Sequence, residues 1–149
     1  MDFIKKMFAS TFFLGFLPGA PATYASFFAL VFPFLIKNSY LYILFFVGYF
    51  FLSVFIINEL EKEWGKDNKK ITADEVLGIL TTFFFLPINF KILLLGFFLF
   101  RFYDIFKFSF IRKIEKISGG LGVILDDILA GILAHISLRV ILFLWPQFK

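Results

Sequence analysis

The chain has 149 residues, of which 60% are hydrophobic and 27 are Phe, and its formal net charge is +4. Soluble globular domains contain about 45–50% apolar residues, so this composition predicts a small integral membrane protein with a single domain over residues 1–149. The sequence has no Cys, which excludes disulfides, thiolate zinc sites and a cysteine nucleophile. No motif of a nucleic-acid-binding module accompanies the basic residues, so an anionic lipid surface is the expected partner.

The first apolar stretch carries no charged residue from position 7 to position 36. A Pro-Gly-Ala-Pro sequence at residues 18–21 interrupts it, and proline breaks a continuous helix. We therefore expect a bent or re-entrant segment at about residues 7–20, followed by a helix from about Thr23 to Ile36. Irregular backbone at membrane depth must line a protein cavity, because lipid cannot satisfy its polar groups.

The second apolar stretch, Tyr40–Ile57, is uninterrupted and close to the length of about 20 residues that a membrane span needs. The highly charged segment that follows, Asn58–Ala73, is expected to be solvated. Three further apolar runs follow, at about Val76–Pro87, Ile92–Phe106 and Val123–Trp145.

These runs predict an all-α fold, a multi-helix integral membrane bundle of about 4–5 hydrophobic helices with a bent N-terminal segment that contains Pro and Gly. If the N-terminus is cytoplasmic, most Lys and Arg residues outside the helices fall in cytoplasmic segments, as the positive-inside rule requires. The third and fourth apolar runs are short for complete spans, so the number of full crossings is left open.

Five carboxylates lie at the edges of the apolar runs, and this topology places them all on the cytoplasmic side. Asp74 and Glu75 begin the third helix, Asp104 ends the fourth, and Asp126 and Asp127 lie near the start of the fifth. Ionised groups at the rim of a bilayer are costly unless they are paired or bound to a cation. The sequence therefore predicts a functional site at this interface.

The segment Ile71–Gly78 allows two interpretations. Thr72 and Glu75 have the spacing of a capping box, and an acid in the first helical turn also favours the helix dipole. The box accounts for Glu75 and accounts less well for Asp74, because one acid suffices for it, and Gly78 leaves a place free of side-chain atoms beside Asp74. A functional role is favoured for Asp74, and both readings stay open for Glu75.

Arg101, Asp104 and Lys107 are three residues apart and share one face of a helix. They form either a mutually neutralised strip at the helix end or a site in which Asp104 binds a metal ion while Arg101 and Lys107 hold a phosphate through charge-assisted hydrogen bonds. The spacing alone does not decide between the two.

Gly119, Gly120 and Gly122 precede the adjacent Asp126 and Asp127 in a loop that enters the last helix. Glycine permits positive φ and close approach of backbone N–H groups to an anion, but the spacing is not that of a P-loop. Two neighbouring aspartates repel each other, and a divalent cation would relieve that repulsion. Hard oxygen ligands without a Cys or His cluster indicate Mg²⁺ or Mn²⁺.

A different class of function, a small membrane transporter, is suggested by the charged residues of the last apolar run, Asp126, Asp127, His135 and Arg139. Transport sites usually lie near the bilayer midplane between repeats, whereas these acids gather at one surface and no repeat is visible. His135 is interpreted as a polar packing residue, because a single isolated His makes no catalytic triad.

Four stretches, in order, resemble motifs of the phosphatidylglycerophosphatase A family of bacterial membrane lipid phosphatases. Gly15–Ser26 resembles its Pro- and Gly-rich loop, Asp74–Gly78 its Asp-Glu-x-x-Gly, Arg101–Lys107 its Arg-x-x-Asp-x-x-Lys, and Gly119–Gly131 its Gly-Gly-x-Gly-x-x-x-Asp-Asp-x-x-Ala-Gly. The resemblance implies Mg²⁺-dependent conversion of phosphatidylglycerophosphate to phosphatidylglycerol by a multi-pass protein of the bacterial cytoplasmic (inner) membrane, with its active site facing the cytoplasm.

The residues and the resemblance together give the expected site. The expected catalytic residues are Asp74, Asp104 and Asp127; the expected Mg²⁺ ligands are Asp74, Glu75, Asp104, Asp126 and Asp127; the expected substrate-binding residues are Thr23, Arg101, Lys107, Gly119 and Gly120. Water is the expected nucleophile, and a phosphoaspartyl intermediate is the alternative. Another lipid phosphate, such as phosphatidic acid, is the alternative substrate.

Overall fold

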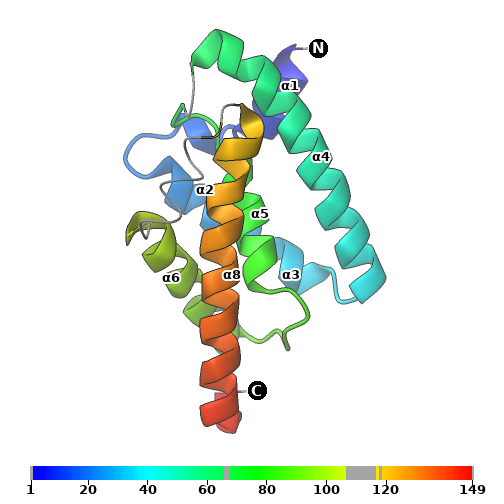
Figure 1. Ribbon diagram of the computed structural model, residues 1–149, viewed down its shortest axis with the longest axis vertical. Helices are drawn as coiled ribbons and strands as arrows, with labels where there is room; N and C mark the ends of the chain where they lie inside the picture. The colour runs from blue at the N-terminus through cyan, green and yellow to red at the C-terminus, as the bar shows by residue number, and fades with distance from the viewer. Residues whose placement is uncertain (1, 66–67, 107–116, 118, 149) are drawn as a thin grey trace.

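The computed structural model describes residues 2–65, 68–106, 117 and 119–148, and every regular element in these ranges is a helix. The elements in chain order are α1 (Asp2–Ala9), η1 (Leu14–Phe16), α2 (Pro21–Ala29), α3 (Val31–Leu35), α4 (Ser39–Trp64), α5 (Ala73–Thr82), α6 (Phe90–Phe106), α8 (Gly120–Leu144) and η2 (Pro146–Phe148). Figure 1 shows α8 running along the long axis of the molecule, with α4 diagonal to it and the shorter helices grouped beside it. The predicted all-α class is confirmed.

Fewer helices than expected are long enough for a membrane span. Among the described residues, α4 and α8 have the length and apolar composition to cross a bilayer, whereas 4–5 hydrophobic helices were expected. The expected helix at Thr23–Ile36 is divided into α2 and α3. The third apolar run also forms a short helix, because α5 ends at Thr82 and the chain then turns through Phe85, whose φ is 52°.

Helix α4 continues to Trp64, so the prediction that it ends at Ile57 is wrong, and the first part of the expected solvated segment is helical. Tertiary contacts explain the extension: Leu60 is buried against Ala9 of α1, and two ion pairs join the same helices. These pairs are Lys5 with Glu59 and Lys6 with Glu63.

Helix α5 forms the centre of the core, since all of its residues except Thr81 are buried. Glycines allow its close packing against two neighbours. A Cβ atom added at Gly78 would overlap the ring of Phe100 on α6, and one added at Gly131 of α8 would touch the Gly78 carbonyl oxygen. The place that Gly78 leaves free is therefore filled by other helices, and α5, α6 and α8 are held at a fixed spacing.

We expect Gly131→Ala to lower the free energy of unfolding by about 1–3 kcal/mol, because the added methyl group must push α5 and α8 apart. The matched control is Gly48→Ala in α4, where an added Cβ meets no atom within 4 Å. That change should raise stability by up to about 1 kcal/mol through helix propensity. Denaturant unfolding in detergent measures both, and equal effects of the two substitutions would contradict the close helix crossing.

His135 stabilises the opposite end of α5. Its Nδ1 donates to the Thr82 carbonyl oxygen at 3.1 Å, and its Nε2 accepts from Arg139 Nε at 3.2 Å. The first bond holds α8 against the C-terminal turn of α5 and the second lies within α8, so His135 acts as the polar packing residue that was expected.

Candidate active site

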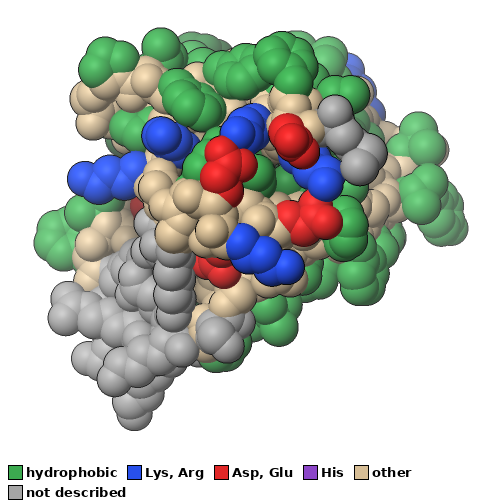
Figure 2. All heavy atoms as spheres, turned by 90° about the horizontal axis from the view of Figure 1, so that it is seen from above, with side chains coloured by type: hydrophobic (Ala, Val, Ile, Leu, Met, Phe, Trp, Pro, Cys, Tyr) green, Lys and Arg blue, Asp and Glu red, His purple; other side chains and the backbone are tan. Residues whose placement is uncertain are grey.

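Acidic and basic side chains gather on the end of the molecule that Figure 2 shows, with hydrophobic side chains around them. Helices α5 and α8 begin toward this end, and α6 ends toward it (Figure 1). The five carboxylates predicted from the sequence lie on these three helix ends.

Four of the five carboxylates are buried, with exposed fractions of 9% for Asp74, 6% for Glu75, 5% for Asp126 and 4% for Asp127. The fifth, Asp104, retains 12% of its side-chain exposure. The charge of Asp127 interacts with those of Glu75 and Asp104, and the charge of Asp74 with that of Asp126. Acids from three helices thus form one cluster, in an environment where an uncompensated charge is expensive.

Arg101 is the cation at the centre of this cluster. Its Nη1 donates to Glu75 Oε2 at 2.9 Å and to Asp104 Oδ2 at 2.8 Å. The same nitrogen lies 3.4 Å from the Ser26 hydroxyl, whose single hydrogen is shared between the Ala22 carbonyl oxygen at 2.7 Å and Glu75 Oε2 at 3.0 Å. Arg101 and Ser26 therefore fix the Glu75 carboxylate from two sides.

Burial and mutual repulsion disfavour the ionised form of the acids on α5. Burial and the charge of Asp104 raise the pKa of Glu75 to about 7, although Arg101 and Ser26 act in the opposite direction. Burial, together with the charges of Glu75 and Asp126, raises the pKa of Asp74 well above its usual range. The cluster therefore has more negative charge than Arg101 compensates, and binding of a further cation would relieve it.

Two buried polar atoms of the cluster have no hydrogen-bond partner among the described residues. They are the acceptor Asp127 Oδ2 and the donor Arg101 Nε. An unsatisfied buried polar group typically costs about 1–3 kcal/mol, and more when it is charged. A ligand that offers an anionic oxygen to Arg101 and a cation or a proton to Asp127 would satisfy both atoms.

The capping box predicted for Thr72 and Glu75 is wrong. Thr72 is the N-cap residue of α5, but its side chain makes no cap hydrogen bond and its hydroxyl donates to Thr11 Oγ1 at 3.0 Å. The Glu75 carboxylate instead bonds Ser26 and Arg101. Helix capping therefore does not explain the acid at position 75, and the remaining interpretation is that Glu75 belongs to the acidic cluster.

The expected substrate-binding residues other than Arg101 and Lys107 lie on different elements of the fold. Gly119 has the positive φ expected of the loop, 84°, but the N–H of Gly120 donates to Asn58 Oδ1 at 2.7 Å. Thr23 is half-buried on α2, one turn before Ser26. Lys107 lies outside the described residues. A role of these residues in phosphate binding stays a prediction.

The fit of a metal ion can be judged from the donors present. Within residues 2–65, 68–106, 117 and 119–148, no three acidic, His or Cys side chains are close enough to hold a metal ion as they are placed. Glu75 and Asp104 face Arg101 instead. The donors nevertheless suit a hard divalent cation, because they are all carboxylate oxygens and Asp127 Oδ2 has no partner among these residues.

Ser26 was not among the expected site residues; its only signal in the sequence is its place at the end of the Gly15–Ser26 motif. We expect Ser26→Ala to lower the free energy of unfolding by about 0.5–1.5 kcal/mol, the usual net contribution of one hydrogen bond, because the hydroxyl hydrogen is shared between Glu75 and the Ala22 carbonyl oxygen. Ser53→Ala is the matched control, since the Ser53 hydroxyl is buried without a described partner and its loss should cost nothing. Thermal unfolding of both variants checks this, and an equal loss in both would rule out the positioning role of Ser26.

The model of a family described as phosphatidylglycerophosphatase A matches residues 7–142. A Bacteroides thetaiotaomicron protein named as a candidate phosphatidylinositol-3-phosphatase is 31% identical over 93% of this chain and 94% of its own length. A phosphatidylglycerophosphatase A of Escherichia coli is 33% identical over 64% of this chain and 57% of its own length, and one of Haemophilus influenzae is 34% identical over 58% and 55%. No solved structure matches the chain.

Proposed function

The chain belongs to the phosphatidylglycerophosphatase A family, and we propose that it hydrolyses phosphatidylglycerophosphate to phosphatidylglycerol and inorganic phosphate in a Mg²⁺-dependent reaction. The observation that carries this proposal is the buried cluster in which Asp127 Oδ2 and Arg101 Nε are both without a partner among the described residues. A phosphate monoester together with a divalent cation supplies what each atom needs.

The proposed ligands of Mg²⁺ are Asp74, Glu75, Asp104, Asp126 and Asp127. When bound, the ion supplies Lewis-acid polarisation of the phosphoryl oxygens and neutralises part of their charge. Glu75 and Asp104 form ion pairs with Arg101 in the structure. If both also bind the metal ion, the guanidinium of Arg101 must be shared between these two acids and the incoming phosphate.

Arg101 is the proposed phosphate-binding cation. Its Nη1 is fixed by Glu75 and Asp104, which orients the guanidinium and leaves Nε–H available for a phosphoryl oxygen. Negative charge on the equatorial oxygens develops in phosphoryl transfer, and a preorganised Arg stabilises it without reorganisation. Ser26 acts as a positioning residue, because it holds the Glu75 partner of this guanidinium.

Asp127 is the proposed proton acceptor. Its Oδ2 would accept a proton from the attacking water as the bond from phosphorus to the glycerol oxygen breaks, and that proton would then pass to the glycerol oxygen, giving the hydroxyl of phosphatidylglycerol and free inorganic phosphate. In the alternative route, an aspartate oxygen attacks phosphorus and displaces the glycerol oxygen, which leaves with a proton, and water then hydrolyses the phosphoaspartate to release inorganic phosphate. Radiolabelled phosphate retained on the protein after a rapid acid quench would identify the second route, and its absence supports the first.

We place the protein in the bacterial cytoplasmic membrane, with α4 and α8 as spans and the charged end at the cytoplasmic face. The length and apolar composition of α4 and α8 support this placement, as does the gathering of charged side chains at one end of the molecule (Figure 2). Because the chain has no Cys, single-cysteine labelling is clean. A thiol reagent should reach Lys37→Cys in intact cells but Lys69→Cys only after permeabilisation; labelling of both from one side would refute α4 as a span.

The headgroup is tested by comparing phosphate release from phosphatidylglycerophosphate, phosphatidylinositol 3-phosphate and phosphatidic acid. We expect kcat/KM to favour phosphatidylglycerophosphate by about tenfold or more, the discrimination that a few fixed polar contacts provide. The second lipid is included because the relative that aligns over 94% of its length carries that activity in its name. A clear preference for phosphatidylinositol 3-phosphate would change the proposed substrate but leave the proposed reaction, hydrolysis of a lipid phosphate monoester, unchanged.

A transporter is the alternative from a different class. Ion or solute flux through reconstituted vesicles without any phosphate release would favour it over the enzyme. The convergence of the acids at one end of the molecule supports the enzyme, since transport sites usually lie near the bilayer midplane.

A further inference from the structure

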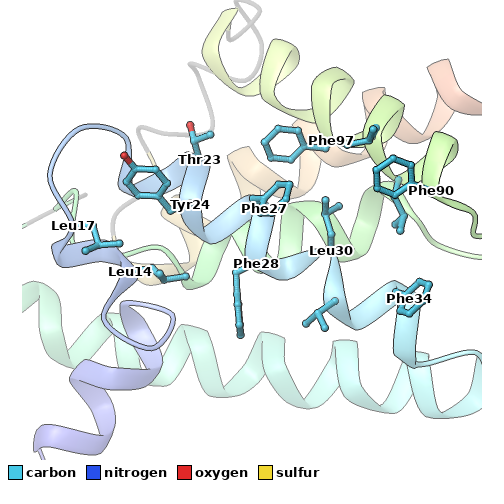
Figure 3. Close-up of a pocket in the computed structure, with 13 residues that line it drawn as sticks. Leu14, Leu17, Thr23, Tyr24, Phe27, Phe28, Leu30, Phe34, Phe90 and Phe97 are labelled. Carbon is cyan, nitrogen blue, oxygen red and sulfur yellow. The ribbon is translucent and has the colours of Figure 1, made fainter.

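An apolar groove with a volume of about 850 Å³ is lined by residues of η1, α2, α3 and α6 (Figure 3). One of its walls is formed by α2 and α3, with Phe27, Val31 and Phe34, and another by α6, with Phe90 and Phe97. Apart from Thr23 and the Tyr24 hydroxyl, the lining side chains are Leu, Val and Phe. The volume is in the usual range of a small-molecule site, about 300–1,000 Å³.

The groove is continuous with the cluster at one end. On α2, Thr23 lines the groove, and Ser26 bonds Glu75 and lies beside Arg101. On α6, Phe97 lines the groove and Arg101 follows one helical turn later. Polar residues of the cluster thus lie within one helical turn of lining residues on both walls, Ser26 on α2 and Arg101 on α6, which suits a ligand with an anionic head and a long apolar tail.

The dimensions and the opening of the groove suit one hydrocarbon chain. From Thr23 to Phe34 the wall spans α2 and α3 and is at most about 16 Å long, at a helical rise of about 1.5 Å per residue. One leaflet of a bilayer has a hydrocarbon thickness of about 15 Å, half of the full core. Phe27 and Phe34 are 60% and 55% exposed at its edge, so a chain can enter from the side.

We propose that this groove holds an acyl chain of the lipid phosphate substrate while the phosphate lies at Arg101. The inference rests on the proposed function and adds to it: the site selects a phosphate monoester that carries a long acyl chain. Occupation of the groove would also fix the depth at which the headgroup meets the acids.

The first test fills the groove. Val31→Trp places an indole in it, and Val47→Trp on α4 is the matched control, since both valines are exposed to a similar degree (37% and 42%) and Val47 does not line the groove. For a long-chain lipid phosphate we expect Val31→Trp to lower kcat/KM by about tenfold, equivalent to lost contacts of about two methylene groups. For a short-chain, water-soluble analogue the change should be less than about twofold.

The second test needs no turnover. Trp fluorescence is measured for Phe34→Trp in the groove and for Phe51→Trp on α4, each with the native Trp64 and Trp145 replaced by Phe, in phosphatidylcholine vesicles that contain a small fraction of brominated lipid. The brominated lipid is either phosphatidylcholine or a non-hydrolysable phosphonate monoester. We expect the phosphonate lipid to quench Phe34→Trp more strongly than brominated phosphatidylcholine does, and the two lipids to quench Phe51→Trp equally.

The two tests separate the inference from the function on which it rests. Selective quenching without hydrolysis by the wild-type protein would retain the groove and refute the phosphatase. Hydrolysis with equal quenching by both lipids, or with the same effect of Val31→Trp on long and short substrates, would make the groove an ordinary lipid-facing surface and overturn the inference.

Discussion

Asp127→Asn is expected to reduce kcat for phosphate release by about a thousandfold or more, since a bound divalent ion and its ligand supply several kcal/mol of transition-state stabilisation. The variant should remain folded and even gain stability. Asp127 is buried, one of its oxygens has no partner among the described residues, and other acids surround it, so its neutralisation removes a repulsion worth about 1–2 kcal/mol. In a chain of this length that gain corresponds to a rise of roughly 2–8 °C in Tm.

The combination of lost turnover and raised Tm is diagnostic, because misfolding would lower both. Asp2→Asn provides the matched control: Asp2 is exposed on α1, outside the cluster, and its substitution should leave both quantities unchanged. Near-normal turnover in Asp127→Asn would remove this residue from the reaction.

Arg101→Ala should have the largest effect on stability. The substitution leaves Glu75 and Asp104 without the cation that they share at 2.9 and 2.8 Å, and breaking a buried ion pair on one side costs about 3–5 kcal/mol. Activity should fall with it, because the proposed phosphate-binding group is lost. Urea unfolding in detergent and phosphate release measure the two losses.

A double-mutant cycle separates the pairing from a general loss of packing. Glu75→Gln removes the partner charge, so Arg101→Ala should cost less in that background than in the wild type, with a coupling of about 1–3 kcal/mol. Arg139→Ala, which removes an exposed Arg at the other end of α5, should change stability much less. Strict additivity of Arg101→Ala and Glu75→Gln would contradict the ion pair.

The acids of the site could be predicted from the sequence because each lies where an apolar run begins or ends, and the cost of burying a charge there is a local property. The residues that bond these acids could not be predicted from the sequence. Ser26 is 49 residues from Glu75 along the chain, and Arg101 is 26 residues from it. Only the packing of α2 and α6 against α5 brings them together. The local explanation of Glu75 as part of a capping box failed for the same reason, since tertiary partners replaced the local one.

Apolar composition predicted where helices form better than where they end. Helix α4 continues past its apolar run because α1 supplies Lys5 and Lys6 as partners for Glu59 and Glu63. The last run forms α8 at nearly its expected length. The third run was expected to reach Pro87, but α5 stops at Thr82 and a turn with Phe85 at positive φ follows. Such a turn has no sequence signal, since Phe rarely adopts that conformation.

The central claim is that acids from α5, α6 and α8 form one divalent-cation site for phosphate-ester hydrolysis. It is tested most directly by measuring phosphate release from phosphatidylglycerophosphate by the purified protein, first in excess EDTA and then with Mg²⁺ restored. We expect activity to disappear in EDTA and to return with Mg²⁺ in the wild-type protein but not in Asp127→Asn. Full activity in excess EDTA would contradict it.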